Sequence, residues 1–321
     1  MTRLSNQPFL AVAGGVFAVV VSGAASAQVS ASPSGSASGL TETVATQLIS
    51  STSLQQMLTI SNAIGFRMGA FQLRPPGIAG SGQVFGMAAG SSAERWNAWG
   101  SLAANNNEYR NLGLDVTTTV VGGDYLAAPT LAVGVSAAYD RSTGSLFNTT
   151  FTGYTVAPYL GWQINKDWVL DATMGWGEGD ASFGAATVKP DRFFYGTNLS
   201  YTTWSGNWQF SGKGSYLYGE EKYNTTLVNA KNKIDEVRLG GQAAYWMNGI
   251  MPYISAAYIS DNQRSVTTGS DDLGKSAWLW SVGANFISLK NNLTGGIAYS
   301  SESGRSNSKR DSVMLNINYR F

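Results

Sequence analysis

The feature that most constrains the fold is a two-residue period of hydrophobicity, which begins at Arg95 and continues to the last residue. In residues 131–139, for example, large apolar side chains alternate with glycine, alanine and serine. Such alternation predicts β-strands, and a tilted membrane strand needs about 9 to 11 residues. Twelve segments are long enough: 95–107, 113–126, 130–141, 151–164, 167–180, 192–204, 207–220, 234–247, 250–261, 277–288, 292–301 and 311–321.

The face opposite the large apolar side chains consists mostly of glycine, alanine, serine and threonine. One apolar face and one small, polar face is the pattern of a barrel embedded in lipid. A soluble β-sandwich also alternates, but it rarely contains strands of this number and length. Charged residues make up 13% of the chain, against about 25% in soluble domains. We therefore expect an all-β fold, a twelve-stranded antiparallel transmembrane β-barrel, with the sandwich as the alternative.

The connections between the predicted strands alternate in length. Every second one is short, as at 205–206 and 248–249, whereas most of the others are long, as at 181–191 and 262–276. This alternation is typical of periplasmic turns and extracellular loops. Aromatic rings, which favour the lipid headgroup level, lie toward both ends: Trp162, Trp168, Trp208, Phe286 and Tyr319 beside the short turns, and Tyr139, Tyr154, Trp176, Tyr218, Trp278 and Tyr299 toward the long loops.

Two segments fit this pattern less well. Pro158 lies inside the fourth predicted strand, where it removes one hydrogen bond of the ladder, and we expect a local bulge there. In the second predicted strand, residues 114–121 are apolar or threonine at too many successive positions to indicate which face is which. The orientation of that strand stays open.

The N-terminal 27 residues have the organisation of a secretory signal peptide. Arg3 supplies a positive charge, residues 9–21 are apolar, and the small residues Ala25 and Ala27 mark a cleavage site before Gln28. A short membrane anchor is the alternative, although two glycines interrupt the apolar stretch. Residues 28–39 are mostly serine, glycine and alanine, with one proline and no charge, which predicts a disordered tail.

Between the tail and the first strand the sequence predicts one helix and one loop. Residues 40–68 lack proline and mix apolar residues with threonine, serine and glutamine. Such a helix would be unstable against lipid tails, so we expect it to thread the pore of the barrel. Residues 69–94 predict a Gly-rich loop.

The composition excludes several classes of chemistry. The chain contains no cysteine and no histidine, which removes Ser-His and Cys-His nucleophiles and the usual zinc ligands. Carboxylate-only chemistry remains formally open, but we expect no enzyme, no cofactor and no metal. Removal of the signal peptide with Arg3 takes the formal net charge from +1 to 0, so no nucleic-acid partner is expected.

Four charged residues of the predicted strands point into the barrel: Asp140, Asp171, Lys213 and Arg238. An unpaired buried charge costs several kcal/mol, and we expect these groups to pair with one another or with the helix. A ring of charges that selects ions is the alternative. Two acids and two bases would give such a ring no net charge with which to attract ions of one sign.

The last strand ends on an aromatic residue. Val313, Leu315, Ile317, Tyr319 and Phe321 share one face, and this ending resembles the outer-membrane signal that the barrel-insertion machinery reads. The match departs from the usual signal at Asn316, where glycine is common, and at Met314, where a polar residue is common.

Three further phrases occur in order along the barrel: 96–101 (Trp-Asn-Ala-Trp-Gly-Ser), 121–125 (Val-Gly-Gly-Asp-Tyr) and 131–139. With the helix and the C-terminal strand, they make residues 40–321 resemble the translocator domain of an autotransporter. The resemblance implies a barrel whose pore holds the preceding helix, with an N-terminal passenger carried to the cell surface. About a dozen residues follow Ala27 before the helix, so we expect little or no passenger. Asn62 is the sole asparagine of the helix, and self-cleavage there is not expected.

These features together predict a non-enzymatic barrel in the outer membrane of a Gram-negative bacterium, which anchors or displays a short N-terminal segment and surface loops. The expected partners are outer-membrane lipid, the barrel-insertion machinery and the inner-membrane secretion channel that reads the signal peptide, and we expect a monomer. A small-solute, porin-like channel and a surface adhesin that acts through its loops are the alternatives.

Overall fold

The computed structural model describes residues 55–69, 72, 95–109, 112–144, 149–183, 186–224, 229–265, 274–288, 291–306 and 308–321. The chain divides into two compact units, 1–34 and 35–321, and all described residues belong to the second. The predicted signal peptide with Ala25, Ala27 and Gln28, the tail 28–39 and the first part of the predicted helix, 40–54, lie outside the described residues.

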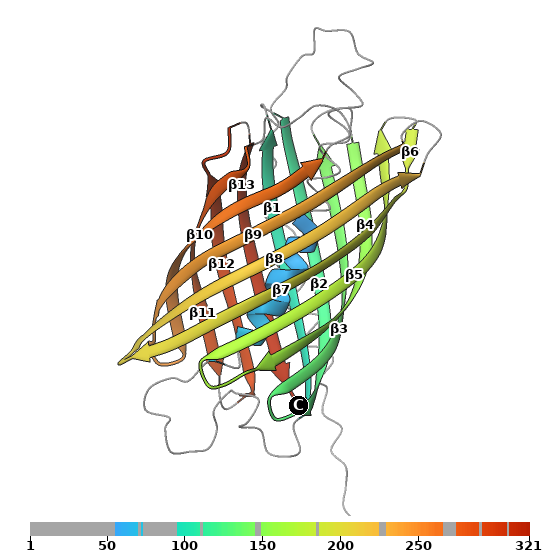
Figure 1. The fold of residues 1–321 in the computed structure, drawn as a ribbon. Helices are drawn as coiled ribbons and strands as arrows, with labels where there is room; N and C mark the ends of the chain where they lie inside the picture. Colours follow the sequence, from blue (N-terminus) through green and yellow to red (C-terminus); the bar gives the residue numbers. More distant parts are fainter. Residues whose placement is uncertain are drawn as a thin grey trace, which may run out of the picture. The chain divides into compact units, whose positions relative to one another are not determined.

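The described chain consists of one helix and a barrel of long strands (Figure 1). The helix spans residues 55–69, and no described helix is both long and apolar enough to cross a bilayer. The strands are β1 (Trp96–Tyr109), β2 (Leu112–Ala128), β3 (Leu131–Gly144), β4 (Thr149–Gln163), β5 (Trp168–Phe183), β6 (Ala186–Val188), β7 (Pro190–Ser205), β8 (Trp208–Asn224), β9 (Asn229–Tyr245), β10 (Ile250–Ser265), β11 (Ser276–Ser288), β12 (Leu293–Ser303) and β13 (Ser308–Arg320).

Twelve of these strands form a closed antiparallel ring, as predicted. Each pairs with its neighbours in sequence, β4 pairs with β5, and β1 pairs with both β2 and β13. At the seam, the Trp96 amide donates to the Phe321 carbonyl at 3.2 Å and the Phe321 amide to the Trp96 carbonyl at 3.0 Å. Closure leaves no strand edge without partners, which a sheet in lipid requires. The short β6 pairs with the end of β5 in the same register as β7, from which residue 189 alone separates it, and so extends the ladder between β5 and β7 at the long-loop end.

We call the end of the barrel with the turns 129–130 and 206–207 the short-turn end, and the opposite end the long-loop end. Several strands extend further toward the long-loop end than the sequence predicts. β8 reaches Asn224 and β10 reaches Ser265, for example, where the alternation predicts ends at 220 and 261. The apolar period stops earlier than the hydrogen-bonded ladder because the ladder does not need apolar side chains to continue.

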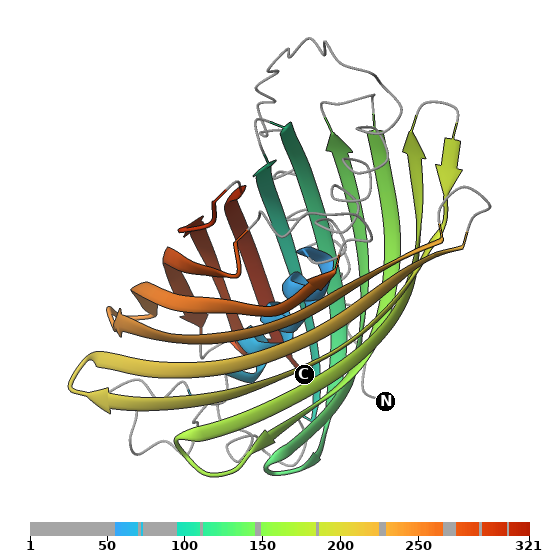
Figure 2. The same cartoon turned by 45° about the horizontal axis from the view of Figure 1, so that its top comes forward.

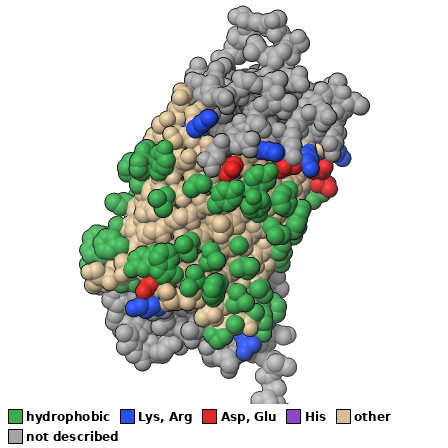
Figure 3. Space-filling view, viewed as in Figure 1, with side chains coloured by type: hydrophobic (Ala, Val, Ile, Leu, Met, Phe, Trp, Pro, Cys, Tyr) green, Lys and Arg blue, Asp and Glu red, His purple; other side chains and the backbone are tan. Residues whose placement is uncertain are grey.

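The outer face of the barrel carries the large apolar side chains. Leu239 and Ile254 are among the most exposed, at 70% and 67%, and apolar side chains cover the wall between the two ends (Figure 3). Charged side chains lie mainly near the long-loop end in this view, with a few near the short-turn end. An exposed apolar band between polar ends is the surface of a barrel that spans lipid.

Pro158 interrupts pairing without the expected bulge. Val156 pairs with Trp176 and Tyr159 with Thr173, so the register of β4 against β5 is the same on both sides of Pro158. The ladder simply lacks pairs at Pro158 and the residue before it. The Thr173 hydroxyl donates to the Pro158 carbonyl at 3.0 Å, so this carbonyl keeps a hydrogen-bond partner although the ladder lacks a pair there.

The structure also settles the orientation of β2. Leu114, Val116, Thr118 and Val120 are buried on the lumen side, whereas Val121 is exposed on the outer side. The lumen face of this strand is therefore apolar over much of its length, because part of the wall packs against other protein atoms instead of water.

Candidate functional site

The helix of residues 55–69 lies inside the barrel (Figure 2), and we call it the lumen helix. Its apolar side chains join lumen-facing side chains of the wall in one buried cluster. Gly161 and Gly219 leave room in the wall, since a Cβ at either glycine would meet the sulfur of Met68 or of Met57. The cluster contains Met57, Leu58, Ile60, Ala63, Ile64 and Met68 of the helix and, among others, Trp99, Val120, Tyr159, Phe194 and Leu217 of the wall.

Polar contacts hold the first turn of the described helix. The Thr155 hydroxyl and the Arg192 Nη1 both donate to Gln56 Oε1 at 2.7 Å, and Gln56 Nε2 donates to the Asp140 carboxylate. Arg192 also forms ion pairs with Asp140 and Glu221, each at 3.1 Å. These side chains are buried. One neutral amide of the helix thus joins a charged network of three strands.

A second polar group holds the other end of the lumen helix. Arg67 Nε and Nη2 donate to the two oxygens of Asp124 at 2.9 and 2.7 Å. Asp124 also accepts from the Tyr159 hydroxyl at 2.9 Å and from Asn97 at 3.2 Å, and Trp99 Nε1 donates to the Tyr159 oxygen at 2.6 Å. Bidentate guanidinium–carboxylate pairs of this kind are the strong, directional class of hydrogen bond.

Further contacts fix the direction of the lumen helix. Gln55 Nε2 donates to Asn107 Oδ1 at 3.1 Å, near the long-loop end of β1. Beyond the helix, Gln72 Nε2 donates to the Asp167 carbonyl at 2.6 Å, in the turn before β5. The described helix therefore begins near the long-loop end and runs toward the short-turn end.

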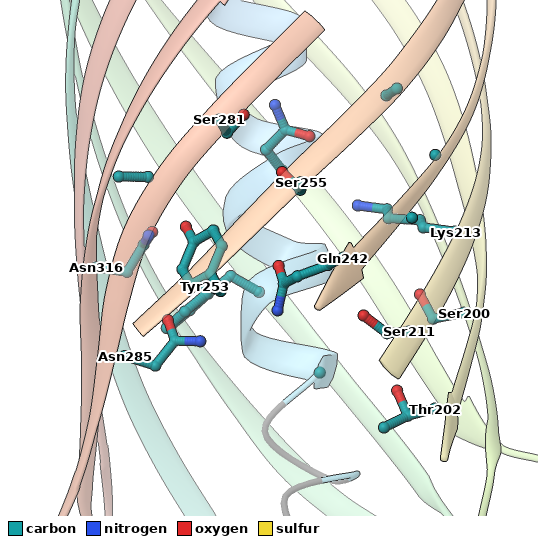
Figure 4. Close-up of a pocket in the computed structure, with 18 of the residues that line it drawn as sticks. Ser200, Thr202, Ser211, Lys213, Gln242, Tyr253, Ser255, Ser281, Asn285 and Asn316 are labelled. Atoms are coloured by element: carbon teal, nitrogen blue, oxygen red, sulfur yellow. The ribbon is translucent and has the colours of Figure 1, made fainter. Parts of the chain in front are cut away.

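A cavity of about 320 Å³ remains in the lumen beside the helix. The helix faces this cavity with Asn62, Gly65, Phe66 and Gly69. These four residues are half-buried, whereas the other residues from 61 to 68 are buried. Their spacing makes one stripe along a helix. The wall contributes mostly small or neutral polar side chains, among them Ser211, Gln242, Ser255, Ser281, Asn285 and Asn316 (Figure 4).

The helix divides the four predicted lumen charges. Asp140 belongs to the buried network with Gln56 and Arg192. Asp171 is buried too and accepts from Asn198 Nδ2 at 2.6 Å. Lys213 and Arg238 instead line the cavity, and Lys213 points from β8 toward the helix in Figure 4.

The residues that hold the helix most firmly were not predicted from the sequence: Arg67, Asp124, Arg192 and Glu221. The phase of the alternation could have placed Asp124, Arg192 and Glu221 on the lumen face, since each occupies a small-residue position of its strand. Arg67, the sole charge between residues 55 and 69, was a signal for a carboxylate partner in the wall.

Another charged group closes part of the long-loop end. Arg305, between β12 and β13, forms ion pairs with Glu302 and Asp261 and donates to the Gly274 carbonyl at 2.9 Å. Burial alone would lower the pKa of the Arg305 guanidinium, but the two carboxylates raise it, so Arg305 stays charged. This group ties the β10–β11 and β12–β13 connections to the wall. In the described part of the chain, no three acidic residues are grouped closely enough to hold a metal.

Comparisons with known proteins find similarity only in the fold. No family model matches the sequence, and no curated protein matches it. Among solved structures, the β domain of the Bordetella autotransporter BrkA is 13% identical, with a TM-score of 0.59, and the match covers 70% of this chain and 99% of that one. The translocator domain of NalP from Neisseria meningitidis is 13% identical, with a TM-score of 0.53 and coverage of 71% and 89%.

An outer-membrane channel from Pseudomonas putida F1 is 12% identical, with a TM-score of 0.55 and coverage of 72% and 97%. At such low identity the match concerns the fold alone. The predicted resemblance is confirmed at that level: this chain has the fold of autotransporter translocator domains, which it shares with an outer-membrane channel.

Proposed function

We propose that this protein is an outer-membrane β-barrel of autotransporter translocator type, which anchors a short N-terminal segment at the surface of a Gram-negative cell. The observation that carries the proposal is the direction of the lumen helix. Its contacts run from Asn107 near the long-loop end to Asp167 near the short-turn end. If the long-loop end faces outward, the chain that precedes Gln55 leaves the barrel at the cell surface.

The polar contacts at both ends of the helix support anchoring over free passage. A segment that only passed through the pore would have no need of specific partners in the wall. Gln56 and Arg67, however, each contact a buried carboxylate of the wall. We propose further that the barrel is not an enzyme, since the chain has neither histidine nor cysteine. In this proposal its partners are lipid, the inner-membrane secretion channel and the barrel-insertion machinery, and it works as a monomer.

The absence of cysteine permits a direct test of topology, with single-cysteine variants and a membrane-impermeant maleimide on intact cells. Ser36→Cys lies in the predicted tail, Ser306→Cys at the long-loop end and Asn207→Cys in a short turn. We expect the first two to react on intact cells and Asn207→Cys to react only after the outer membrane is permeabilised. A Ser36→Cys variant that behaves like Asn207→Cys would contradict the proposed anchoring.

A second candidate function is that of a small-solute channel, and the cavity beside the lumen helix favours it. Its 320 Å³ is enough space for hydrated ions or a small molecule, since ligand pockets start at about 300 Å³. The two functions are compatible, because a helix that fills one side of the lumen leaves the other side for solutes.

A further inference from the structure

From the described chain, the lumen helix leaves two basic side chains and no acidic one on the cavity side of the lumen. Among the described residues, Lys213 and Arg238 are the only charged side chains that line the cavity. Neither predicted lumen acid lines the cavity: Asp140 lies in the network with Arg192, and Asp171 is buried and accepts a hydrogen bond from Asn198. Counted over the whole lumen the four charges cancel, but the cavity itself presents only positive ones.

Lys213 is the better placed of the two bases to meet a solute. It forms no ion pair among the described residues, although the charge of Asp171 attracts it. Its Nζ lies against the helix at Gly65, where a Cβ would come within 2.6 Å of it. The ammonium therefore stands between the helix and the wall, beside the cavity that Lys213 lines. Arg238 is partly neutralised, since its Nε donates to Glu236.

The remaining walls do not offset these charges. Serine hydroxyls and the amides of Gln242, Asn285 and Asn316 are neutral and can donate hydrogen bonds to an anion. A positive charge in a narrow space with low-dielectric walls raises the local concentration of anions, and rings or patches of Lys and Arg are the usual basis of anion selectivity in pores.

We propose that the cavity is a path for small anions beside the lumen helix, with Lys213 as the residue that sets its selectivity. The helix has two parts in this arrangement. It narrows the lumen so that permeating ions pass Lys213, and through Gln56 it contacts Asp140, which stays in the buried network with Arg192 and away from the cavity. This inference rests on the proposed membrane location of the barrel.

The test is the reversal potential of the purified, full mature protein in planar bilayers under a KCl gradient. The reversal potential of the wild-type current should have the sign of the chloride equilibrium potential. Lys213→Gln should move the reversal potential most of the way to zero, and Lys213→Glu should give it the sign of the potassium equilibrium potential. Lys222→Gln is the matched control, because Lys222 lies on the outer face of the same strand and pairs with Glu220 at 3.3 Å; it should leave the potential unchanged.

Two results would overturn the anion path alone: protein that is inserted in liposomes but passes no current, or equal reversal potentials for wild type and Lys213→Glu. Protein that does not insert at all would contradict the membrane barrel as well. Sedimentation of the liposomes with bound, protease-resistant protein distinguishes these cases before any current is recorded.

Discussion

Arg67 is the sole charged residue of the lumen helix, and its bidentate pair with Asp124 is almost completely buried, with side-chain exposures of 1% and 0%. Removal of one partner of such a pair leaves the other charge without compensation, which costs about 3 to 5 kcal/mol. We expect Arg67→Met to lower the free energy of helix docking by this amount, while the barrel stays folded. Protease cleavage within the helix, followed by mass spectrometry, measures the loss.

A double-mutant cycle with Asp124→Asn distinguishes pairing from packing. The amide that replaces the Asp124 carboxylate carries no charge that needs compensation, so Arg67→Met/Asp124→Asn should restore part of the protection that Arg67→Met loses. Equal losses in the single and double variants would show that the ion pair contributes little and that the Arg67 stem acts through packing.

Gly134 lies beneath the ring of Tyr159 on the lumen face of β3. A Cβ there would come within 2.6 Å of the Gly123 carbonyl and would strike the ring, which Trp99 and Asp124 hold in place. Because neither neighbour is the free end of a flexible side chain, Gly134→Ala should destabilise the barrel by about 1 to 3 kcal/mol, the usual cost of overpacking. Urea unfolding in detergent micelles measures the change.

Gly214→Ala provides the comparison, since a Cβ at Gly214 meets nothing within 4 Å. Alanine is favoured over glycine within regular structure by about 0.5 to 1 kcal/mol, so this variant should be neutral or slightly more stable. Similar losses for both variants would indicate that the strands respond to any side chain, and that the contact with Tyr159 is not the cause.

At the residue scale, strand phase predicted which side chains point inward but not what they touch. Asp140 was expected to pair with another of the four lumen charges or with the helix. It meets the helix at Gln56, but its ion pair is with Arg192, which was not among those four. The partner could not be read from the sequence, because the rotation and depth of a helix within a lumen depend on the packing of the whole cluster. Lys213 forms no ion pair among the described residues, although Asp171 attracts it, and this too needed the structure.

The lumen helix depends on its apolar side chains as much as on its polar ends. Ile60 and Ile64 are completely buried against the wall, and an Ile→Ala change in a packed core costs about 2 to 5 kcal/mol. We expect Ile60→Ala/Ile64→Ala to release the helix from the lumen in part of the population, and single-channel conductance should rise strongly. Asn62→Ala, on the cavity side of the same turn, should leave conductance nearly unchanged. A rise of equal size in both variants would argue against apolar docking.

The packing of the lumen helix against the wall explains why two elements were hard to predict. The wall encloses the first half of the helix, so residues 55–61 are buried all round and show no amphipathic stripe. β2 gave no clear orientation because its lumen face packs Val120 into the helix cluster instead of lining water. The rule of apolar outside and polar inside holds for wall that faces solvent, and it fails where the wall faces the helix.

At the scale of the whole molecule, the twelve strands and their order followed from the sequence because lipid imposes the same two requirements on every strand, an apolar outer face and a complete ladder. β6 was not predicted, since its three residues continue the ladder of β5 beyond the region in which large apolar side chains alternate. Closure between β1 and β13 was expected only from the even count of strands, and the pairs from Asn97↔Arg320 to Tyr109↔Ser308 give it a register.

The seam leaves two roles open to Phe321, which an experiment can separate. Its backbone closes the ring with Trp96, but its side chain is 55% exposed on the lipid face. A substitution that keeps the backbone should therefore change the stability of the folded barrel little. If the face formed with Val313, Leu315, Ile317 and Tyr319 is the insertion signal, Phe321→Ala should instead reduce the amount of barrel in the outer membrane severalfold, and Phe321→Tyr, which keeps the ring, should not.

Quantification of the protein in outer-membrane fractions, beside urea unfolding of the same variants refolded in micelles, tests this. A loss of stability that parallels the loss of inserted protein would assign Phe321 to packing at the seam, whereas loss of insertion alone assigns it to recognition before the barrel has closed.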